Sequence, residues 1–272
     1  MKVDEVKQIT NKALDELVSA LESGHSETLT AYLKTMSLFS KYSLNNLFLI
    51  ARQRPDARRV AGYQTWRKLG RFVRKGEKGI AIIAPLVRRK STDEIEEASQ
   101  NVRVVAGFKV AHIFSEEQTD GNPLPELGSV TGNPSDYFDR LAKFVMAQGI
   151  ALEYSEEIAP AKGTATRGKI TLLPGQTPAE LLATLAHETA HALMHFSDRR
   201  AETTKRIRET EAEAVAFVVC NAIGLETGTS SADYIGLYAG DAKLLTESLE
   251  YVQQTANRIL TAIAPENSAT PA

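Results

Sequence analysis

The chain has 272 residues, 43% hydrophobic and 24% charged, which is typical of a soluble globular protein with buried cores. The single cysteine, Cys220, excludes an intramolecular disulfide, and no apolar run of about 18 residues predicts a transmembrane helix. The net charge of −2 hides an asymmetry, because residues 52–90 hold 13 Lys/Arg and 2 Asp/Glu. With no apolar signal-peptide core at the N-terminus, a cytoplasmic protein without a membrane partner is expected.

The first part of the chain is predicted to combine helices with a small sheet. Helical spacing of apolar residues predicts helices over 3–22, 28–38 and 43–53. A short helix around Trp66 follows, and Gly70 is well placed to end it. Apolar, β-branched runs within 76–87 and 103–114 predict two strands, which a polar loop joins.

The second part is predicted to be mainly helical. The Gly- and Pro-rich stretch 115–136 is the best linker candidate, with the linker itself placed at 126–134. Short strands at 150–156 and 168–175 are expected, together with four helices, at 135–148, from Pro178 onward with Thr177 as N-cap, at 206–223 and at 241–263. We therefore expect an α+β protein with two domains, 1–125 and 135–264, and a disordered tail at 265–272.

The stretch "TLAHETAHALMHF" contains an H-E-x-x-H motif on a predicted helix. His187 and His191 are four residues apart, so both imidazoles project from one face and can bind one zinc ion. Glu188 lies beside them as the general base that accepts a proton from an activated water molecule. The alternative is a chance occurrence, but the apolar surroundings half-bury the histidines, and a metal compensates such burial.

A catalytic zinc needs a third protein ligand, and the helix "IRETEAEAVAFVVC" offers three glutamates. Glu209 and Glu213 share a face, so Glu209 is predicted to be the ligand and Glu213 an acceptor for the ring N–H of a ligand histidine. Glu211 is interpreted as a solvated surface charge. His195 lies one turn beyond His191, too far along a straight helix to join the same ion, and is interpreted as a structural helix-end residue.

The arrangement predicts metal-assisted hydrolysis of a peptide. Glu188 would take a proton from water and later deliver it to the leaving amine. Tyr234 is a candidate for stabilising the oxyanion, with Tyr238 nearby, although either residue can be a packing aromatic. A strand such as "GKITLL" is a candidate for pairing with an extended peptide.

The basic segment 52–90 interleaves cations with aromatic rings, which is the pattern of proteins that bind single-stranded nucleic acid. A solvated basic face with Trp66 and Phe72 in a small core is the alternative. The candidate DNA contacts are Arg58, Arg59, Tyr63, Trp66, Arg67, Lys68, Arg71, Arg74, Lys75 and Lys78.

Two sets of motifs resemble one family. "FSKYSLNNLFLIARQRPDARRVAGYQTWRKLGRFVRKGEKGIAIIAP" and "GFKVAHIFSEEQTDGNPLPEL" resemble the N-terminal domain of ArdC-like antirestriction proteins. "HETAHALMH" followed by "ETEAEAVAFVVCNAIGL" is similar to their zincin-like domain, related to the ImmA/IrrE metallopeptidases. The resemblance implies a single-stranded-DNA-binding domain before a metallopeptidase-like domain, in a protein of mobile genetic elements that protects incoming DNA. It also implies ligand roles for His187, His191 and Glu209 and the catalytic role for Glu188.

Three functional hypotheses follow from these motifs. The first is a gluzincin-like zinc metallopeptidase, a hydrolase recruited to single-stranded DNA and acting on an unknown protein or peptide substrate. The second is a non-enzymatic DNA-binding protective protein with structural zinc. The third is a regulatory peptidase that cleaves a repressor-like partner. Mn²⁺ or Fe²⁺ can replace Zn²⁺ in a site with two histidines and one glutamate.

Overall fold

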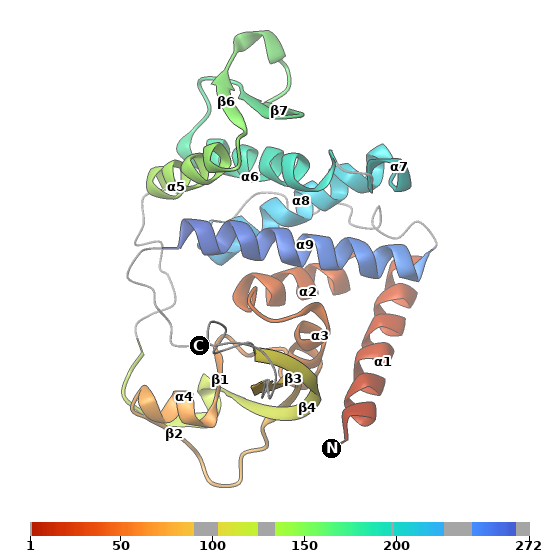
Figure 1. Ribbon diagram of the computed structural model, residues 1–272, viewed down its shortest axis with the longest axis vertical. Coiled ribbons are helices and arrows are strands. Elements are labelled where there is room, and N and C mark those ends of the chain that lie inside the picture. Colours follow the sequence, from red (N-terminus) through yellow and green to blue (C-terminus); the bar gives the residue numbers. More distant parts are fainter. Residues whose placement is uncertain (1, 90–102, 125–133, 197–198, 226–240, 265–272) are drawn as a thin grey trace, which may run out of the picture. The chain divides into compact units, whose positions relative to one another are not determined.

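The computed structural model describes residues 2–89, 103–124, 134–196, 199–225 and 241–264 (Figure 1). Its helices and strands confirm the α+β class and fall into two compact units. The first unit comprises residues 1–15 and 45–123, and the second comprises 16–44 and 124–272. Almost all of the expected linker and the whole expected tail lie outside the described residues.

The first unit contains a long antiparallel β-ribbon. β3 pairs with β4, and β1 pairs with the other side of β4, which gives the strand order β1-β4-β3, while β2 and β5 form a separate pair. Val6, Leu49 and Ala81 form a buried cluster that joins helices to this sheet. The elements are the start of α1 (Val3–Glu22), nearly all of α3 (Leu44–Gln53), β1 (Val60–Gly62), α4 (Tyr63–Lys68), β2 (Arg71–Val73), β3 (Ile80–Arg89), β4 (Arg103–Ser115), η1 (Glu116–Gln118) and β5 (Thr119–Gly121).

Side chains of α3 cover the outer edge of β3. The Asn46 amide donates to the Ile83 carbonyl and accepts from the Ile83 N–H, both at 2.9 Å. The Gln53 amide makes the same pair of bonds with Ala81, also at 2.9 Å. An exposed strand edge is a site for unwanted pairing, and these two amides satisfy alternate residues of that edge.

The second unit is mainly helical. α6 packs against α5 and α8, and α8 in turn packs against α9 and α2 (Figure 1). A small sheet of order β6-β8-β7 lies against α6, with β6 parallel and β7 antiparallel to β8. The elements are α2 (Glu27–Leu38), α5 (Pro134–Ala147), β6 (Ala151–Tyr154), η2 (Glu156–Ile158), β7 (Gly163–Thr166), β8 (Lys169–Leu172), α6 (Pro178–Met194), α7 (Arg199–Glu202), α8 (Lys205–Ala222) and α9 (Ala242–Ile263).

The start of α6 is the one that the sequence predicts. The Thr177 hydroxyl accepts from the Glu180 backbone N–H, and the Glu180 carboxylate accepts from the Thr177 N–H. Pro178 occupies the first turn, where its missing N–H is not needed. This reciprocal cap fixes where the helix begins and therefore which residues of the H-E-x-x-H motif share a face.

Three features differ from the expectations. β8, which contains most of "GKITLL", is the central strand of its sheet, so it cannot pair with an added peptide. The first part of the 115–136 stretch forms η1 and β5 rather than a linker. Residues 16–44 group with the second unit, so the compact units are not contiguous halves. None of the helices in the described part of the chain is long and apolar enough to cross a membrane.

Candidate metal centre and basic surface

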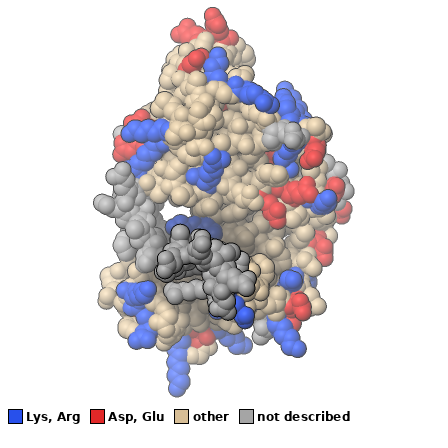
Figure 2. Space-filling view, viewed as in Figure 1, with Lys and Arg blue, Asp and Glu red and all other residues tan. Residues whose placement is uncertain are grey.

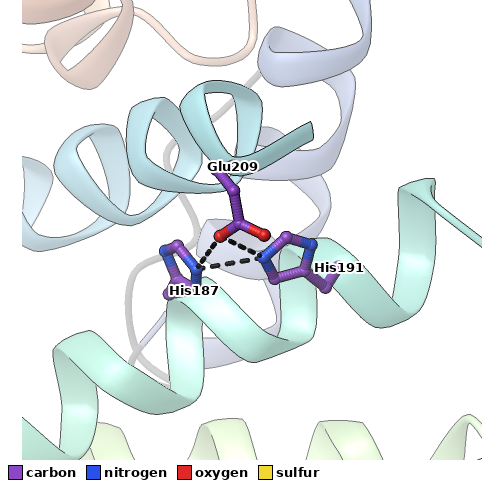
Figure 3. Close-up of side chains that lie close together, drawn as sticks. All are labelled: His187, His191 and Glu209. Atoms are coloured by element: carbon purple, nitrogen blue, oxygen red, sulfur yellow. Dashed lines mark hydrogen bonds and ion pairs between the residues drawn. The ribbon is translucent and has the colours of Figure 1, made fainter. Parts of the chain in front are cut away.

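Three potential ligands from two helices converge in the second unit (Figure 3). The Nε2 atoms of His187 and His191, one turn apart on α6, are 3.0 Å from each other. The Glu209 Oε2 atom, on α8, is 3.7 Å from the His187 Nε2 and 3.4 Å from the His191 Nε2. The structure therefore brings together the three side chains that the sequence predicts as ligands.

The two imidazoles are partly buried, and the carboxylate is more exposed. Exposed side-chain fractions are 24% for His187, 14% for His191 and 48% for Glu209. Burial lowers the pKa of both histidines, that of His191 to about 4, with the neighbouring His187 adding to the effect. Neutral imidazoles are the form that binds a metal, so burial favours the ligand state.

Glu188 lies beside the cluster and is buried, with 7% of its surface exposed. Burial raises the pKa of Glu188 to about 7, and the Glu209 charge adds to the shift. A bound divalent cation would act in the opposite direction and favour the carboxylate. Gly163 of β7 lies against Glu188, because a Cβ atom placed there would come within 2.8 Å of the Glu188 Cγ.

A buried polar chain continues behind His191. The His191 Nδ1 is 2.8 Å from the His195 Nδ1, and the His195 Nε2 is 2.9 Å from the Glu211 Oε2. The other carboxylate oxygen of Glu211 accepts a hydrogen bond from Arg199. Burial by itself would raise the pKa of Glu211, but the hydrogen bond from His195 and the Arg199 charge contribute to a net lowering.

The interpretation of Glu211 as a surface charge is wrong, since its side chain is fully buried. A sequence signal for this was available, because Ile207, Val215 and Val218 place it on the apolar stripe of α8. Glu213 is exposed, and the hydrogen-bond partner of the His191 Nδ1 is His195. His195 is the C-cap of α6, as predicted. Tyr234 and Tyr238 lie outside the described residues.

Several DNA-binding candidates in the first unit have structural partners. Trp66 is 2% exposed and its indole N–H donates to the Phe114 carbonyl, so it is a core residue and cannot stack on a base. Arg71 donates to Thr119 and to the Asn122 carbonyl. Arg74 pairs with Glu77 and Asp120, and Arg59 pairs with Glu116. These arginines hold the fold of the first unit together.

The remaining candidates are exposed around α4 and β2. Tyr63 on α4 is 46% exposed, so its ring is accessible. Phe72 on β2, which the alternative placed in a small core, is 56% exposed and is accessible too. In the space-filling view, Lys and Arg side chains stand out over this part of the first unit, where few Asp and Glu side chains are visible (Figure 2). The exposed cations among the candidates with no structural partner named above are Arg58, Arg67, Lys68, Lys75 and Lys78.

Comparison with known proteins gives one family match and a likeness in fold. The family model for the N-terminal domain of anti-restriction factor ArdC matches residues 5–114. Two crystal structures of the antirestriction ArdC protein from plasmid R388 share the fold. The metal-free form is 21% identical with a TM-score of 0.52, covering 93% of this chain and 97% of that one. The Mn(II)-bound form is 22% identical with a TM-score of 0.53, covering 95% and 99%.

A curated relative is an uncharacterized protein from Bacillus anthracis, 25% identical over 305 aligned positions. The alignment covers 96% of this chain and 51% of the relative, so the chain spans about half the length of that protein. Residues 5–114 therefore match the model of the ArdC N-terminal domain, and the H-E-x-x-H helix lies outside the matched residues. Over residues 5–114 the chain is similar to the ArdC N-terminal domain, and over nearly its whole length it shares the fold of the ArdC protein.

Proposed function

We propose that this chain is an antirestriction protein that combines single-stranded DNA binding with a zinc-dependent metallopeptidase-type site. The observation that carries the proposal is the convergence of His187, His191 and Glu209 beside Glu188. The family match supports a DNA-binding role for residues 5–114. The likeness in fold to a protein with a Mn(II)-bound form supports a divalent cation in the second.

The donor set fits a divalent cation. Ligand atoms 2.0–2.1 Å from a tetrahedral zinc ion lie about 3.3–3.4 Å from one another. The three ligand-to-ligand distances here are 3.0, 3.4 and 3.7 Å, close to that spacing. Two imidazole nitrogens that face each other also satisfy each other only if one carries a proton, whereas a cation accepts both lone pairs. Zn²⁺, Mn²⁺ and Fe²⁺ all suit this set of ligands, and the availability of each ion decides which one is bound.

When bound, the cation would supply Lewis acidity to a water molecule and a substrate carbonyl. His187, His191 and Glu209 would hold it, while Glu188 would accept a proton from the water and pass it to the leaving amine. An unknown peptide or protein substrate would pair along β7. Among the described residues β7 pairs only with β8, and its first residue, Gly163, lies against Glu188.

Substitution of Glu188 by Gln tests the enzymatic part of the proposal. The amide keeps the shape of the side chain but cannot accept the proton, so peptide hydrolysis should fall by at least ~100-fold. Cation content, measured by elemental analysis, should be unchanged and serves as the control. If plasmid transfer into a restricting host remains fully protected in this variant, protection does not need hydrolysis. The protein would then be a DNA-binding shield.

DNA binding is tested at Lys68 and Lys75, two exposed cations outside the hydrogen bonds and ion pairs described above. The Lys68→Glu/Lys75→Glu variant should bind a single-stranded oligonucleotide more weakly in fluorescence anisotropy. The slope of log affinity against log salt concentration should shrink by about 0.7 for each phosphate that the variant no longer neutralises. A matched pair with the same charge change is Lys34→Glu/Lys143→Glu, at exposed positions of the second unit. Equal reductions of affinity in the two variants would contradict a site on α4 and β2.

A further inference from the structure

The polar chain behind His191 crosses the interior of the second unit and is built from four helices. His195 ends α6 and is 1% exposed, while Glu211 on α8 is fully buried. Arg199 of α7 donates to Glu211 and, at 3.2 Å, to the hydroxyl of Ser248 on α9. The Arg199 guanidinium also lies 4.0 Å from the centre of the Tyr251 ring. The contacts with His195 and with the anchored Arg199 hold the Glu211 carboxylate in one orientation.

The direction of each hydrogen bond in this polar chain follows from the direction of the one before it. An arginine can only donate, so one oxygen of Glu211 accepts from Arg199 and its charge is balanced there. The other oxygen, 2.9 Å from the His195 Nε2, then accepts the Nε2–H of His195. A neutral imidazole that donates from Nε2 must accept at Nδ1. The group 2.8 Å from that acceptor is the His191 Nδ1, which therefore carries the proton.

A proton on the His191 Nδ1 leaves a lone pair on its Nε2, the atom that faces His187 and Glu209. We propose that His195 and Glu211 are positioning residues that fix this tautomer of His191 and present its Nε2 lone pair to a divalent cation. The inference rests on the proposed function, because it deepens the same metal centre. It assigns the orienting role to Glu211 through His195, and not to the exposed Glu213.

Glu211→Gln is a sharp test because the two side chains have the same shape. Arg199 requires an acceptor, so the Gln oxygen should face Arg199 and the Gln NH₂ should face the His195 Nε2. His195 would then accept at Nε2 and donate from Nδ1, which moves the His191 proton to Nε2. The His191 Nε2 could then bind a cation only after losing its proton, which would break the new arrangement of hydrogen bonds. Mn²⁺ and Zn²⁺ affinity, measured by calorimetric titration, should fall about 10- to 100-fold, as is typical for such partners of ligand histidines.

The matched control is Glu213→Gln, which makes the same change of charge two residues further along the same helix. It should weaken binding by clearly less than Glu211→Gln, because Glu213 is exposed and outside the described chain of hydrogen bonds. His195→Asn provides a second variant, since its side-chain oxygen can replace the Nδ1 acceptor without Glu211. It should retain more cation affinity than His195→Ala.

Nitrogen-15 NMR of the metal-free protein reports the tautomer directly, which a purely structural role for Glu211 would not change. The wild type should show His191 protonated at Nδ1, and Glu211→Gln should show it protonated at Nε2. An unchanged tautomer in Glu211→Gln, or equally weakened cation binding in Glu211→Gln and Glu213→Gln, would overturn the inference. A wild type with the predicted tautomer that binds neither Mn²⁺ nor Zn²⁺ would instead overturn the proposed metal centre and leave the relay in place.

Discussion

Gly163 sets the space available to Glu188. A Cβ atom at this position would lie 2.6 Å from the Thr184 Cγ2 and 2.8 Å from the Glu188 Cγ. Real Cβ atoms do not approach other atoms so closely, so either β7 or the Glu188 side chain would have to move. The absence of a side chain at this one residue therefore brings the edge strand next to the proposed general base.

Gly163→Ala is expected to destabilise the second unit by about 1–3 kcal/mol, which is the usual cost of overpacking. Chemical denaturation measures this cost. Gly62→Ala is the control, because a Cβ atom at Gly62 would meet nothing within 4 Å. A Gly163→Ala variant as stable as Gly62→Ala would show that β7 does not pack against Glu188 as described.

At the scale of the elements, the amides of α3 complete the edge of β3. Asn46 is 8% exposed and satisfies both backbone groups of Ile83. Without the amide, a partly buried N–H and carbonyl would have no partner in the described structure. Unsatisfied buried groups cost more than the net gain from the hydrogen bonds that satisfied them.

Asn46→Ala is therefore expected to lower the free energy of unfolding by about 1–3 kcal/mol in urea denaturation. Its neighbour Asn45 is exposed on the same helix, so Asn45→Ala controls for the change in helix propensity. Equal stabilities of the two variants would mean that the edge of β3 does not depend on this amide. Hydrogen exchange at the Ile83 N–H should rise only in Asn46→Ala.

The sequence predicted the long elements well because they carry a strong periodic signal. α1, α2, α3, α5, α8 and α9 begin and end within about two residues of their expected bounds, and β3 and β4 lie where the apolar runs predicted them. The three-residue strands β2 and β5 could not be predicted, since so few residues show no alternation. Their pairing depends on contacts distant in sequence, such as that of Phe72 with Asp120.

At the candidate metal centre, local spacing predicted that His187 and His191 share one face of α6. It did not predict the residues that lie behind them. His187 and His191 are four residues apart, and helix geometry alone places residues at that spacing on the same face. Glu211 was missed because alternation of three glutamates suggested that the middle one points to solvent, whereas the apolar stripe of α8 turns it inward. The contact of His195 with Glu211 needs the packing of α6 on α8, which no local pattern encodes.

At the scale of the whole molecule, neither of the two compact units is continuous along the chain. α2 belongs to the second unit, where Leu29, Leu33 and Met36 are buried and the Ser37 hydroxyl bonds to Asn221 of α8. A chain cut near residue 125 would separate α2 from these partners. We therefore expect that the boundary near residue 125 does not separate two independently stable halves.

A fragment of residues 1–124 is expected to expose the apolar face of α2. It should bind a hydrophobic dye and show fast hydrogen exchange over residues 27–38, whereas the full chain should protect them. The buried side chains at stake are worth about 1.5–3 kcal/mol each. A monomeric fragment with full protection over 27–38 would show that α2 is stable without α8.

His187, His191 and Glu209 are proposed to bind one divalent cation together. Anomalous diffraction from crystals of the full chain grown with Mn²⁺ or Zn²⁺ tests it most directly. We expect a single strong peak within bonding distance of the two Nε2 atoms and a Glu209 oxygen, and we expect this peak to be absent in His187→Ala. A crystal with no peak there at saturating cation, or with the Glu209 carboxylate turned away from the peak, would contradict it.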